Sequence, residues 1–275
     1  MNFIDNVTIV IVSHKSKKKL INLIKDISND IKIIIVENSL DKSIEIELSK
    51  LGKKIEIIFS ENNGYGSAIN LARTHVTTKY FFVLNPDMQK IDDKLIKVFY
   101  ESAKELNDNF GALGPRFENV SEKSHKQSNI NEKYGLIESI SGSAMFFCSE
   151  VFDKNRGFDE NFFLYFEDDD LCIKSKKAGF ENILVYDAVI DHIAGGSIGP
   201  PNIQNQWEKF SNMSFSRCYI EKKYFGKLKA FKISTLIIFR SILKFVGHIL
   251  IFKIKKVLRD LAHLYGALVY LLGNK

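Results

Sequence analysis

The stretch VTIVIVS, residues 7–13, decides the fold class. It is a short β-branched run that ends in a polar turn, which is typical of a strand buried on both faces. Apolar residues then recur at helical spacing over residues 20–27. Further buried strands are predicted at residues 31–39, 54–60 and 80–87, with a helix at 66–76. Strands that alternate with helices predict βαβ units and a mostly parallel sheet covered on both faces.

Polar residues stand at the end of each predicted strand, where ligands of such sheets bind. They are Ser13 and His14, Glu37 and Asn38, residues 62–66, and residues 85–87. Gly64 and Gly66 precede a helix, whose N-terminus favours an anion such as a diphosphate, although a plain glycine turn explains them equally well. Asp87 can bind a hard cation through oxygen. Taken alone, Asn-Pro-Asp favours an Asx–Pro turn.

Four consecutive acids at residues 167–170 follow the aromatic run 162–166. A short helix is predicted at residues 171–178, ended by Gly179. Acids in a first helical turn gain about 0.3–1 kcal/mol each from the helix dipole, which explains one or two of the four. Because successive helical side chains fan out by about 100°, at most two can face one pocket.

Further strands are predicted at residues 144–152 and 183–192, and a loop or lid at residues 117–134. His192, at the end of the last strand, is either a metal ligand or a loop histidine, and by itself the loop interpretation is favoured.

Composition indicates a folded protein: of 275 residues, 45% are hydrophobic and 12% aromatic. The three cysteines, Cys148, Cys172 and Cys218, have no paired spacing, which favours a reducing cytosol over a disulfide framework. No basic segment precedes the first strand, so no signal peptide is expected.

The formal net charge of +6 is unevenly distributed. Residues 217–275 contain 13 Lys or Arg and 2 Asp or Glu, whereas the preceding residues sum to −5. Amphipathic helices are predicted at residues 228–252 and 254–272. Arg240, Lys244 and His248 interrupt the apolar run 233–252, which argues against a membrane span and favours an interfacial or packed helix. Alternation of lysine with apolar residues favours an anionic membrane over nucleic acid as a partner.

Seven stretches in order resemble the inverting family-2 glycosyltransferases, especially the rhamnosyltransferase-like branch. They are VTIVIVSHKS, IIIVENS, NNGYGSAINLA, FFVLNPDM, SGSAMFFCSEVF, GFDENFFLYFEDDDLCIKSKKAGF and DHIAGGS, all within residues 7–217. The resemblance implies an α/β, A-type glycosyltransferase fold, Rossmann-like, with helices flanking a mostly parallel sheet. It also implies a nucleotide-sugar donor carrying dTDP or UDP and a divalent cation, Mg or Mn.

The resemblance assigns roles to individual residues by match. Asp168, in FEDDD, matches the catalytic base, while Asp170 supports the helix start and Lys174 is a structural partner. Asp87 and His192 match metal-binding residues. The residues that match the nucleotide-sugar site are Ser13, His14, Glu37, Asn62, Gly64, Asn70 and Asn85. Tyr165, Phe166 and Glu167 are candidates for the acceptor site.

These features predict a catalytic domain at residues 1–216 and a basic helical tail at 217–275. The expected activity is metal-dependent inverting transfer of a sugar, with rhamnose preferred, to a lipid-linked or polysaccharide acceptor in surface glycan synthesis. The expected location is the cytoplasmic side of the plasma membrane, without nucleic acid and with oligomerisation left open. The alternative is a non-catalytic nucleotide-sugar-binding or scaffold protein of the same fold. A nucleotidyltransferase ranks lower, because SHKSKKK after the first strand contains no glycine.

Overall fold

The computed structural model describes residues 2–118, 133–192 and 202–273, with the side chain of residue 192 excepted. Most of the expected loop or lid at 117–134 therefore lies outside the described residues. The chain forms two compact units: Met1–Glu160 with Asp168–Gly199, and Asn161–Glu167 with Pro200–Lys275. The boundary expected at Arg217 falls inside α7 (Ile203–Phe225), because 23 residues there form one continuous helix.

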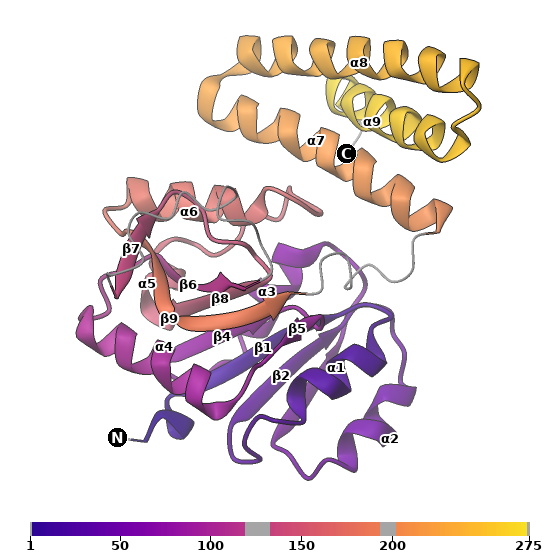
Figure 1. The fold of residues 1–275 in the computed structure, drawn as a ribbon. Coiled ribbons are helices and arrows are strands. Elements are labelled where there is room, and N and C mark those ends of the chain that lie inside the picture. The colour runs from indigo at the N-terminus through magenta and orange to yellow at the C-terminus, as the bar shows by residue number, and fades with distance from the viewer. Residues whose placement is uncertain (1, 119–132, 193–201, 274–275) are drawn as a thin grey trace. The chain divides into compact units, whose positions relative to one another are not determined.

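The sheet of the first unit begins with four parallel strands in the order β3-β2-β1-β4 (Figure 1). These are β1 (Val7–Ser13), β2 (Lys32–Glu37), β3 (Ile55–Phe59) and β4 (Tyr80–Leu84). All four were predicted, and β1 has the predicted bounds. The strands form because β-branched and aromatic side chains fill both faces of the sheet: every residue of β1 and β4 is buried.

The remaining strands make the sheet mixed. β8 (Ala144–Cys148) runs antiparallel to β4 and to β6 (Ala112–Phe117), and β6 runs parallel to β9 (Asn182–His192). β5 (Met88–Gln89) and β7 (Tyr134–Ile137) each pair antiparallel with β9. The expectation of a mostly parallel sheet thus holds for its first half, where each crossover contains a helix.

Helices cover both faces of the sheet. α1 (Lys17–Ile24), α2 (Ser43–Ser49) and α4 (Asp93–Glu105) pack on one face, together with Ile9, Ile33 and Phe82. α3 (Tyr65–Arg73), α5 (Ser149–Lys154) and α6 (Glu167–Lys177) pack on the other, together with Val10, Ile34 and Phe81. A 3-10 turn, η1 (Phe3–Asp5), precedes β1. Neighbouring residues of a strand thus belong to different cores, because successive side chains of a β-strand point to opposite faces of the sheet.

The second unit contains α7, α8 (Lys227–Leu250) and α9 (Ile254–Leu272), which lie side by side (Figure 1). Helices α8 and α9 were both predicted. Small residues allow close packing: a Cβ on Gly266 of α9 would lie 2.0 Å from the Ser211 carbonyl oxygen of α7. The prediction that α8 is too interrupted to span a membrane is not supported, because its length and mean hydropathy of 1.6 would allow a crossing. Arg240 and Lys244 lie near the middle of this apolar stretch, but the aliphatic and aromatic residues around them keep its average hydropathy high.

Candidate active site

The strand order of the sheet changes direction at β1: β2 and β3 lie on one side of it, and β4 lies on the other. In an open α/β sheet this topological switch opens a crevice beyond the carboxyl ends of the two central strands. Ser13 and Glu37 are register partners at that edge, and the Asn38 N–H donates to the Ser13 carbonyl at 2.8 Å. The fold therefore gathers the predicted polar residues of β1, β2 and β4 at one edge of the sheet.

Two of the polar side chains at this edge are already used within the protein. Ser13 is buried, with its hydroxyl 3.1 Å from that of Ser16, and the Glu37 carboxylate accepts hydrogen bonds from the backbone N–H and hydroxyl of Ser39. By contrast, His14 Nδ1 and Asn38 Oδ1 are buried and have no hydrogen-bond partner among the described residues. Because buried polar atoms normally have partners, these two are the atoms best placed to meet a ligand. Asn38 received no individual role from the sequence.

The glycine turn before α3 is explained largely by the backbone and by packing. Gly64 adopts φ 109°, which disfavours any other residue, and a Cβ on Gly66 would lie 2.8 Å from the Phe158 Cβ. The Asn70 side chain donates to the Phe158 carbonyl and accepts from its N–H, so it fastens α3 to the segment before α6. Asn62 stays exposed. The structure thus gives Gly66 and Asn70 packing and positioning roles, while Asn62 remains open to a ligand.

The Asn-Pro-Asp segment forms a turn directly after β4. The Met88 N–H donates to the Asn85 carbonyl at 3.2 Å, and the Asn85 N–H donates to the Ser143 carbonyl at 2.8 Å. Asp87 is only 4% exposed. Met88 then pairs with His192 between β5 and β9. The turn interpretation therefore holds, and the turn brings Asp87 next to the backbone of His192.

The residues around Asp87 fit a divalent cation in ligand type. A buried carboxylate supplies the oxygen atoms that Mg and Mn prefer, and the antiparallel pairing places a histidine on the neighbouring strand. Across residues 2–118, 133–191 and 202–273, no three His, Cys, Asp or Glu side chains cluster in a way that could hold a metal ion. The backbone pairing of Met88 with His192 places the two predicted ligands, Asp87 and His192, on adjacent segments of the chain.

Asp168 is held by the loop that precedes β8. Its Oδ2 accepts the Gly142 N–H at 2.7 Å, and its Oδ1 accepts the Asp169 N–H at 3.0 Å. Burial raises the pKa of Asp168 to about 6, with a smaller contribution from the negative charge of Asp169, against the stabilising effect of the Gly142 N–H. A carboxylate with this pKa is ionised at pH 7 and is a stronger base than an ordinary aspartate, as general-base catalysis requires.

Three of the four acids, Asp168, Asp169 and Asp170, have different partners. Helix α6 begins at Glu167, four residues before the predicted start, so all four lie in its opening turns. Asp169 accepts from the Ser139 hydroxyl, and Asp170, fully buried, lies 3.7 Å from Lys174 Nζ. Lys174 also donates to the Gly157 carbonyl, which confirms its predicted structural role. The angular spread of a helix separates the acids as expected, so that Asp168 and Asp169 meet different residues of the loop 139–143 while Asp170 faces Lys174.

This loop, residues 139–143, joins the segments that the sequence analysis singled out. Its Gly142 N–H holds Asp168, the Gly142 carbonyl accepts from the Tyr65 hydroxyl at 2.7 Å, and the Ser143 carbonyl holds Asn85. The backbone groups of two adjacent residues, Gly142 and Ser143, therefore link the proposed base, the start of α3 and the Asn-Pro-Asp turn. Sequence reasoning matched this stretch to a family motif but gave none of its residues a role. Its only local signal is a Ser-Gly-Ser before a fully buried strand.

The aromatic run before α6 belongs to the second unit, and not to the catalytic unit as expected. The fully buried Phe162 packs edge-on against Tyr219, and the Arg217 guanidinium lies over the Phe166 ring. Tyr165 and Phe166 adopt φ values of 70° and 68°, in the left-handed region that side chains seldom occupy. Burial, aided by the Glu167 charge, raises the pKa of Tyr165 to about 12. Packing with α7 thus accounts for Phe162 and contributes at Phe166, while Glu167 is buried at the start of α6.

Known proteins are similar to this chain in sequence. The family described as "Glycosyl transferase family 2" matches residues 8–156. The low-salt glycan biosynthesis hexosyltransferase Agl10 of Haloferax volcanii is 24% identical over 231 residues, covering 75% of this chain and 73% of that protein.

Solved structures share the fold. The mannosyltransferase PcManGT of Pyrobaculum calidifontis, in complex with GDP-Man and Mn2+, has a TM-score of 0.62 at 12% identity and covers 98% of this chain and 88% of its own. Residues 1–349 of S. aureus TarS, in complex with UDP-GlcNAc, have a TM-score of 0.56 at 12% identity and cover 98% and 92%. Since the family match spans more than half of the sequence and the A-type fold is present, the chain belongs to glycosyl transferase family 2.

Proposed function

We propose that this protein transfers a hexosyl group, with rhamnose as the first candidate, from a nucleoside-diphosphate sugar to a lipid-linked or polysaccharide acceptor, with inversion at the anomeric carbon. The observation that carries the proposal is the position of Asp168, whose carboxylate is held by Gly142 and has a pKa raised to about 6. The hexosyltransferase named in glycan biosynthesis supports a sugar of this class.

In the proposed reaction, Asp168 takes the proton from the acceptor hydroxyl while the acceptor oxygen attacks the anomeric carbon of the donor. The bond between that carbon and the donor's diphosphate breaks, and the diphosphate leaves with the electron pair. One displacement from the opposite face inverts the configuration, so no covalent enzyme intermediate is required. The link through Gly142 and Ser143 to Asn85 supports this arrangement, because it ties the base to the turn that carries Asp87.

A divalent cation is part of the proposal. Asp87 and His192 would hold it, and a bound Mg or Mn would offset the negative charge on the departing diphosphate. His14 Nδ1 and Asn38 Oδ1, with the exposed Asn62, would bind the nucleotide at the ends of β1 and β2. The GDP-Man and UDP-GlcNAc complexes of the similar folds support a nucleotide-sugar donor. We place the enzyme at the cytoplasmic face of the plasma membrane, where a lipid-linked acceptor is presented.

A donor screen tests this function. Full-length protein is given Mn or Mg, a lipid-linked acceptor, and dTDP-, UDP- and GDP-sugars in turn, and release of the nucleoside diphosphate is measured. We expect acceptor-dependent release with one donor class. Asp168→Asn should lower this rate by about 10²–10⁴-fold, which is the usual contribution of a general base, without loss of donor binding.

The matched control is Asp187→Asn, an identical change at an exposed residue of β9, which should keep full activity. Loss of donor binding in Asp168→Asn would make Asp168 a ligand-binding residue instead of the base. Donor binding without acceptor-dependent release in the native protein, across the whole panel, would favour the non-catalytic alternative.

A further inference from the structure

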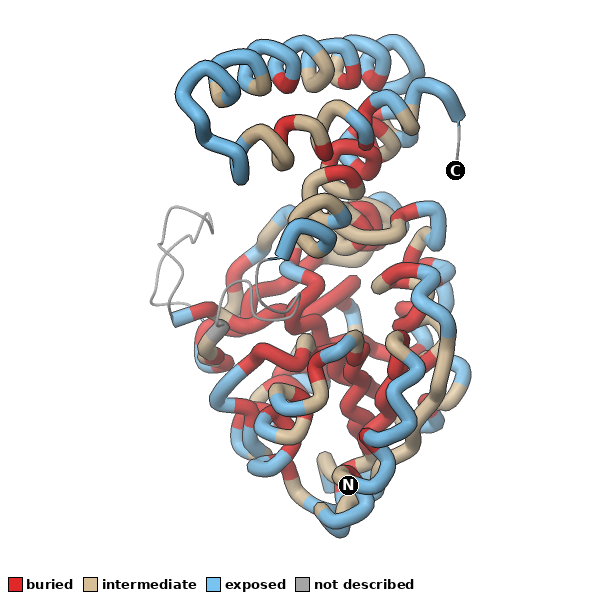
Figure 2. Tube along the Cα trace, turned by 90° about the vertical axis from the view of Figure 1, so that its right-hand side faces the viewer, coloured by how far each residue is buried: buried red, intermediate tan, exposed pale blue. Residues whose placement is uncertain are grey.

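Helix α8 presents an apolar face that the protein leaves uncovered. Phe239, Leu243, Val246 and Leu250 recur at helical spacing and are 50–73% exposed, and Leu236 extends the same stripe. Figure 2 shows α8, the uppermost helix of Figure 1, in the exposed colour along most of its length. Its buried positions are the small residues Ala230, Ser234 and Ser241. An exposed apolar stripe of this length marks a surface that contacts another apolar phase.

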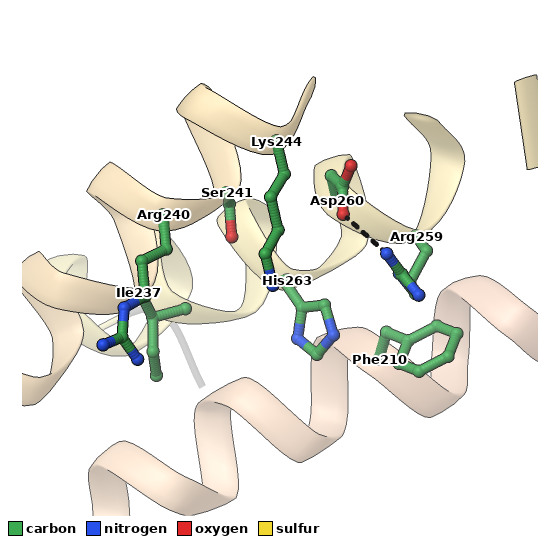
Figure 3. Close-up of a pocket in the computed structure, with 8 residues that line it drawn as sticks. All are labelled: Phe210, Ile237, Arg240, Ser241, Lys244, Arg259, Asp260 and His263. Atoms are coloured by element: carbon green, nitrogen blue, oxygen red, sulfur yellow. Dashed lines mark hydrogen bonds and ion pairs between the residues drawn. The ribbon is translucent and has the colours of Figure 1, made fainter. Parts of the chain in front are cut away.

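A cavity of about 290 Å³ opens among the three helices of the same unit (Figure 3). It is lined by Phe210 of α7 and by side chains of α8 and α9. Since one liquid water occupies about 30 Å³, this volume equals roughly ten waters and has room for a compact hydrated anion. Pockets for drug-sized ligands begin at about 300 Å³, so the cavity lies just below that range and suits a smaller group.

The lining of the cavity is cationic. Arg240 and Lys244 come from α8 and Arg259 from α9, against a single carboxylate, Asp260. His263 also lines the cavity, and burial together with the charge of Arg259 and Lys244 lowers the pKa of His263, which keeps it neutral at pH 7. The lining therefore carries a net charge of +2.

Asp260 does not cancel this charge by pairing with all three cations. It is 2% exposed and is held by His248 Nδ1, with Arg259 Nη2 3.4 Å from its other oxygen. The dashed line in Figure 3 marks the contact with Arg259, whereas Arg240 and Lys244 extend from α8 without a drawn partner. Within the described part of the chain no ion pair involves either side chain. Their charges are available to an external anion.

The two α8 cations lie between the buried and the apolar faces of the helix. At about 100° per residue, Arg240 and Lys244 fall on the flank that separates Ser241 from the stripe at Phe239 and Leu243. A helix whose apolar face enters a bilayer by about 5–10 Å places such flanking cations at the level of the lipid head groups. The cavity would then open where lipid phosphates lie.

We propose that this cavity is a binding site for the phosphate head group of a membrane lipid, while the apolar face of α8 lies in the lipid. A phosphate monoester carries a charge of about −1.5 to −2 at pH 7, which complements the net charge of the lining. Arginine binds phosphate through two parallel hydrogen bonds, and lysine through a point charge. This site is separate from the proposed catalytic residues, and it needs no glycosyl transfer to be tested.

Vesicle binding by full-length protein tests the proposal. Phosphatidylcholine vesicles receive either phosphatidic acid, a monoester, or phosphatidylglycerol, a diester, at equal surface charge, and bound protein is measured by sedimentation. We expect tighter binding to phosphatidic acid. Arg240→Gln with Lys244→Gln should weaken that binding about tenfold more than the control pair Lys255→Gln with Lys256→Gln, and should abolish the preference between the lipids. The control removes the same charge from exposed positions of α9 outside the cavity.

Three other results would overturn the proposal. Equal weakening by the two pairs would mean diffuse attraction to an anionic surface. Equal binding of the native protein to both lipids would mean that the cavity does not recognise a monoester. Binding of inorganic phosphate or diphosphate to the cavity in solution, with no difference between the pairs on vesicles, would assign the site to a soluble anion. The variant Arg240→Lys with Lys244→Arg, which keeps both charges, should retain binding and shows that loss in the glutamine pair is not misfolding.

Discussion

At the scale of the single residue, burial of the proposed base, Asp168, has a cost in stability. Its folded-state pKa of about 6 exceeds the ordinary value of 3.8, so the folded protein holds the proton more tightly than the unfolded chain does. The free energy of unfolding should therefore fall as the pH rises from about 4 to about 6, and stay lower above that range. The Gly142 N–H offsets part of this cost, since it favours the charged form.

Replacing Asp168 by Asn should therefore stabilise the protein at pH 7. A shift of about 2 pKa units corresponds to at most about 3 kcal/mol, and loss of the bond from the Asp169 N–H reduces the expected gain to about 1–2 kcal/mol. The gain should disappear at pH 4, where the native Asp168 is protonated. Denaturant unfolding at both pH values measures it. Asp187→Asn, at an exposed position, should change stability little at either pH, and a gain for Asp168→Asn that persisted at pH 4 would contradict the assigned pKa.

At the scale of the element, the loop at residues 139–143 holds the carboxylate of Asp168, the proposed base. Tyr65 also contacts this loop. Its hydroxyl donates to the Gly142 carbonyl, and the N–H of the same residue, Gly142, donates to Asp168. Tyr65 stands at the start of α3, so the glycine turn that seemed to serve a phosphate also sets the position of this tyrosine. We regard Tyr65 as a positioning residue.

Tyr65→Phe should reduce kcat roughly three- to tenfold and leave the KM for the donor unchanged, because misplacement of the base affects the chemical step. Loss of one hydrogen bond should cost about 0.5–1.5 kcal/mol of stability. Tyr134→Phe, on β7, is the matched control, because it removes a hydroxyl that donates to the Glu105 carboxylate at 2.6 Å. The control should lose similar stability but no activity. Equal loss of kcat in both variants would show a general effect of destabilisation.

At the scale of the whole molecule, the division into two units separates the proposed chemistry from the proposed attachment. The apolar surface of α8 and the basic cavity both belong to the helical unit, whereas Asp168, Asp87 and the loop at residues 139–143 belong to the sheet unit. The segment 161–167 is the exception, since it precedes Asp168 directly but packs with α7. Its left-handed residues, Tyr165 and Phe166, lie where the chain passes from one unit to the other.

Apolar insertion of α8 can be tested separately from head-group recognition. Phe239→Asp with Leu243→Asp places charges on side chains that are 58% and 57% exposed, and should weaken vesicle binding at least tenfold, because burial of each native side chain contributes about 1.5–3 kcal/mol. Ile46→Asp with Leu136→Asp makes the same change at exposed positions of the sheet unit and should leave binding unchanged. Unaltered binding in the α8 pair would show that this face does not enter the lipid.

Local patterns in the sequence predicted those strands and helices whose residues show a clear hydrophobic run or periodicity. Runs of β-branched residues predicted β1 to β4, because strands buried on both faces need continuous apolar sequence, and periodicity predicted α1, α3, α8 and α9. Helix α4 and strand β6 were not predicted. Helix α4 does carry a start signal, Asp92, whose side chain accepts the Leu95 N–H. The family motifs, taken in order, predicted the fold and the family, and both are confirmed.

Only the tertiary structure decided how these elements combine into a site. The antiparallel insertion of β8, the pairing of Met88 with His192, and the contact of Gly142 with Asp168 all join residues far apart in the chain. No local propensity encodes such contacts, because they depend on which strands become neighbours. The sequence by itself therefore determined strands β1 to β4 and helices α1, α3, α8 and α9, and it singled out the acid at position 168 as a candidate. Packing of the strands around β8 decided that this acid is half-buried, that a backbone N–H holds it, and that its pKa is raised to about 6.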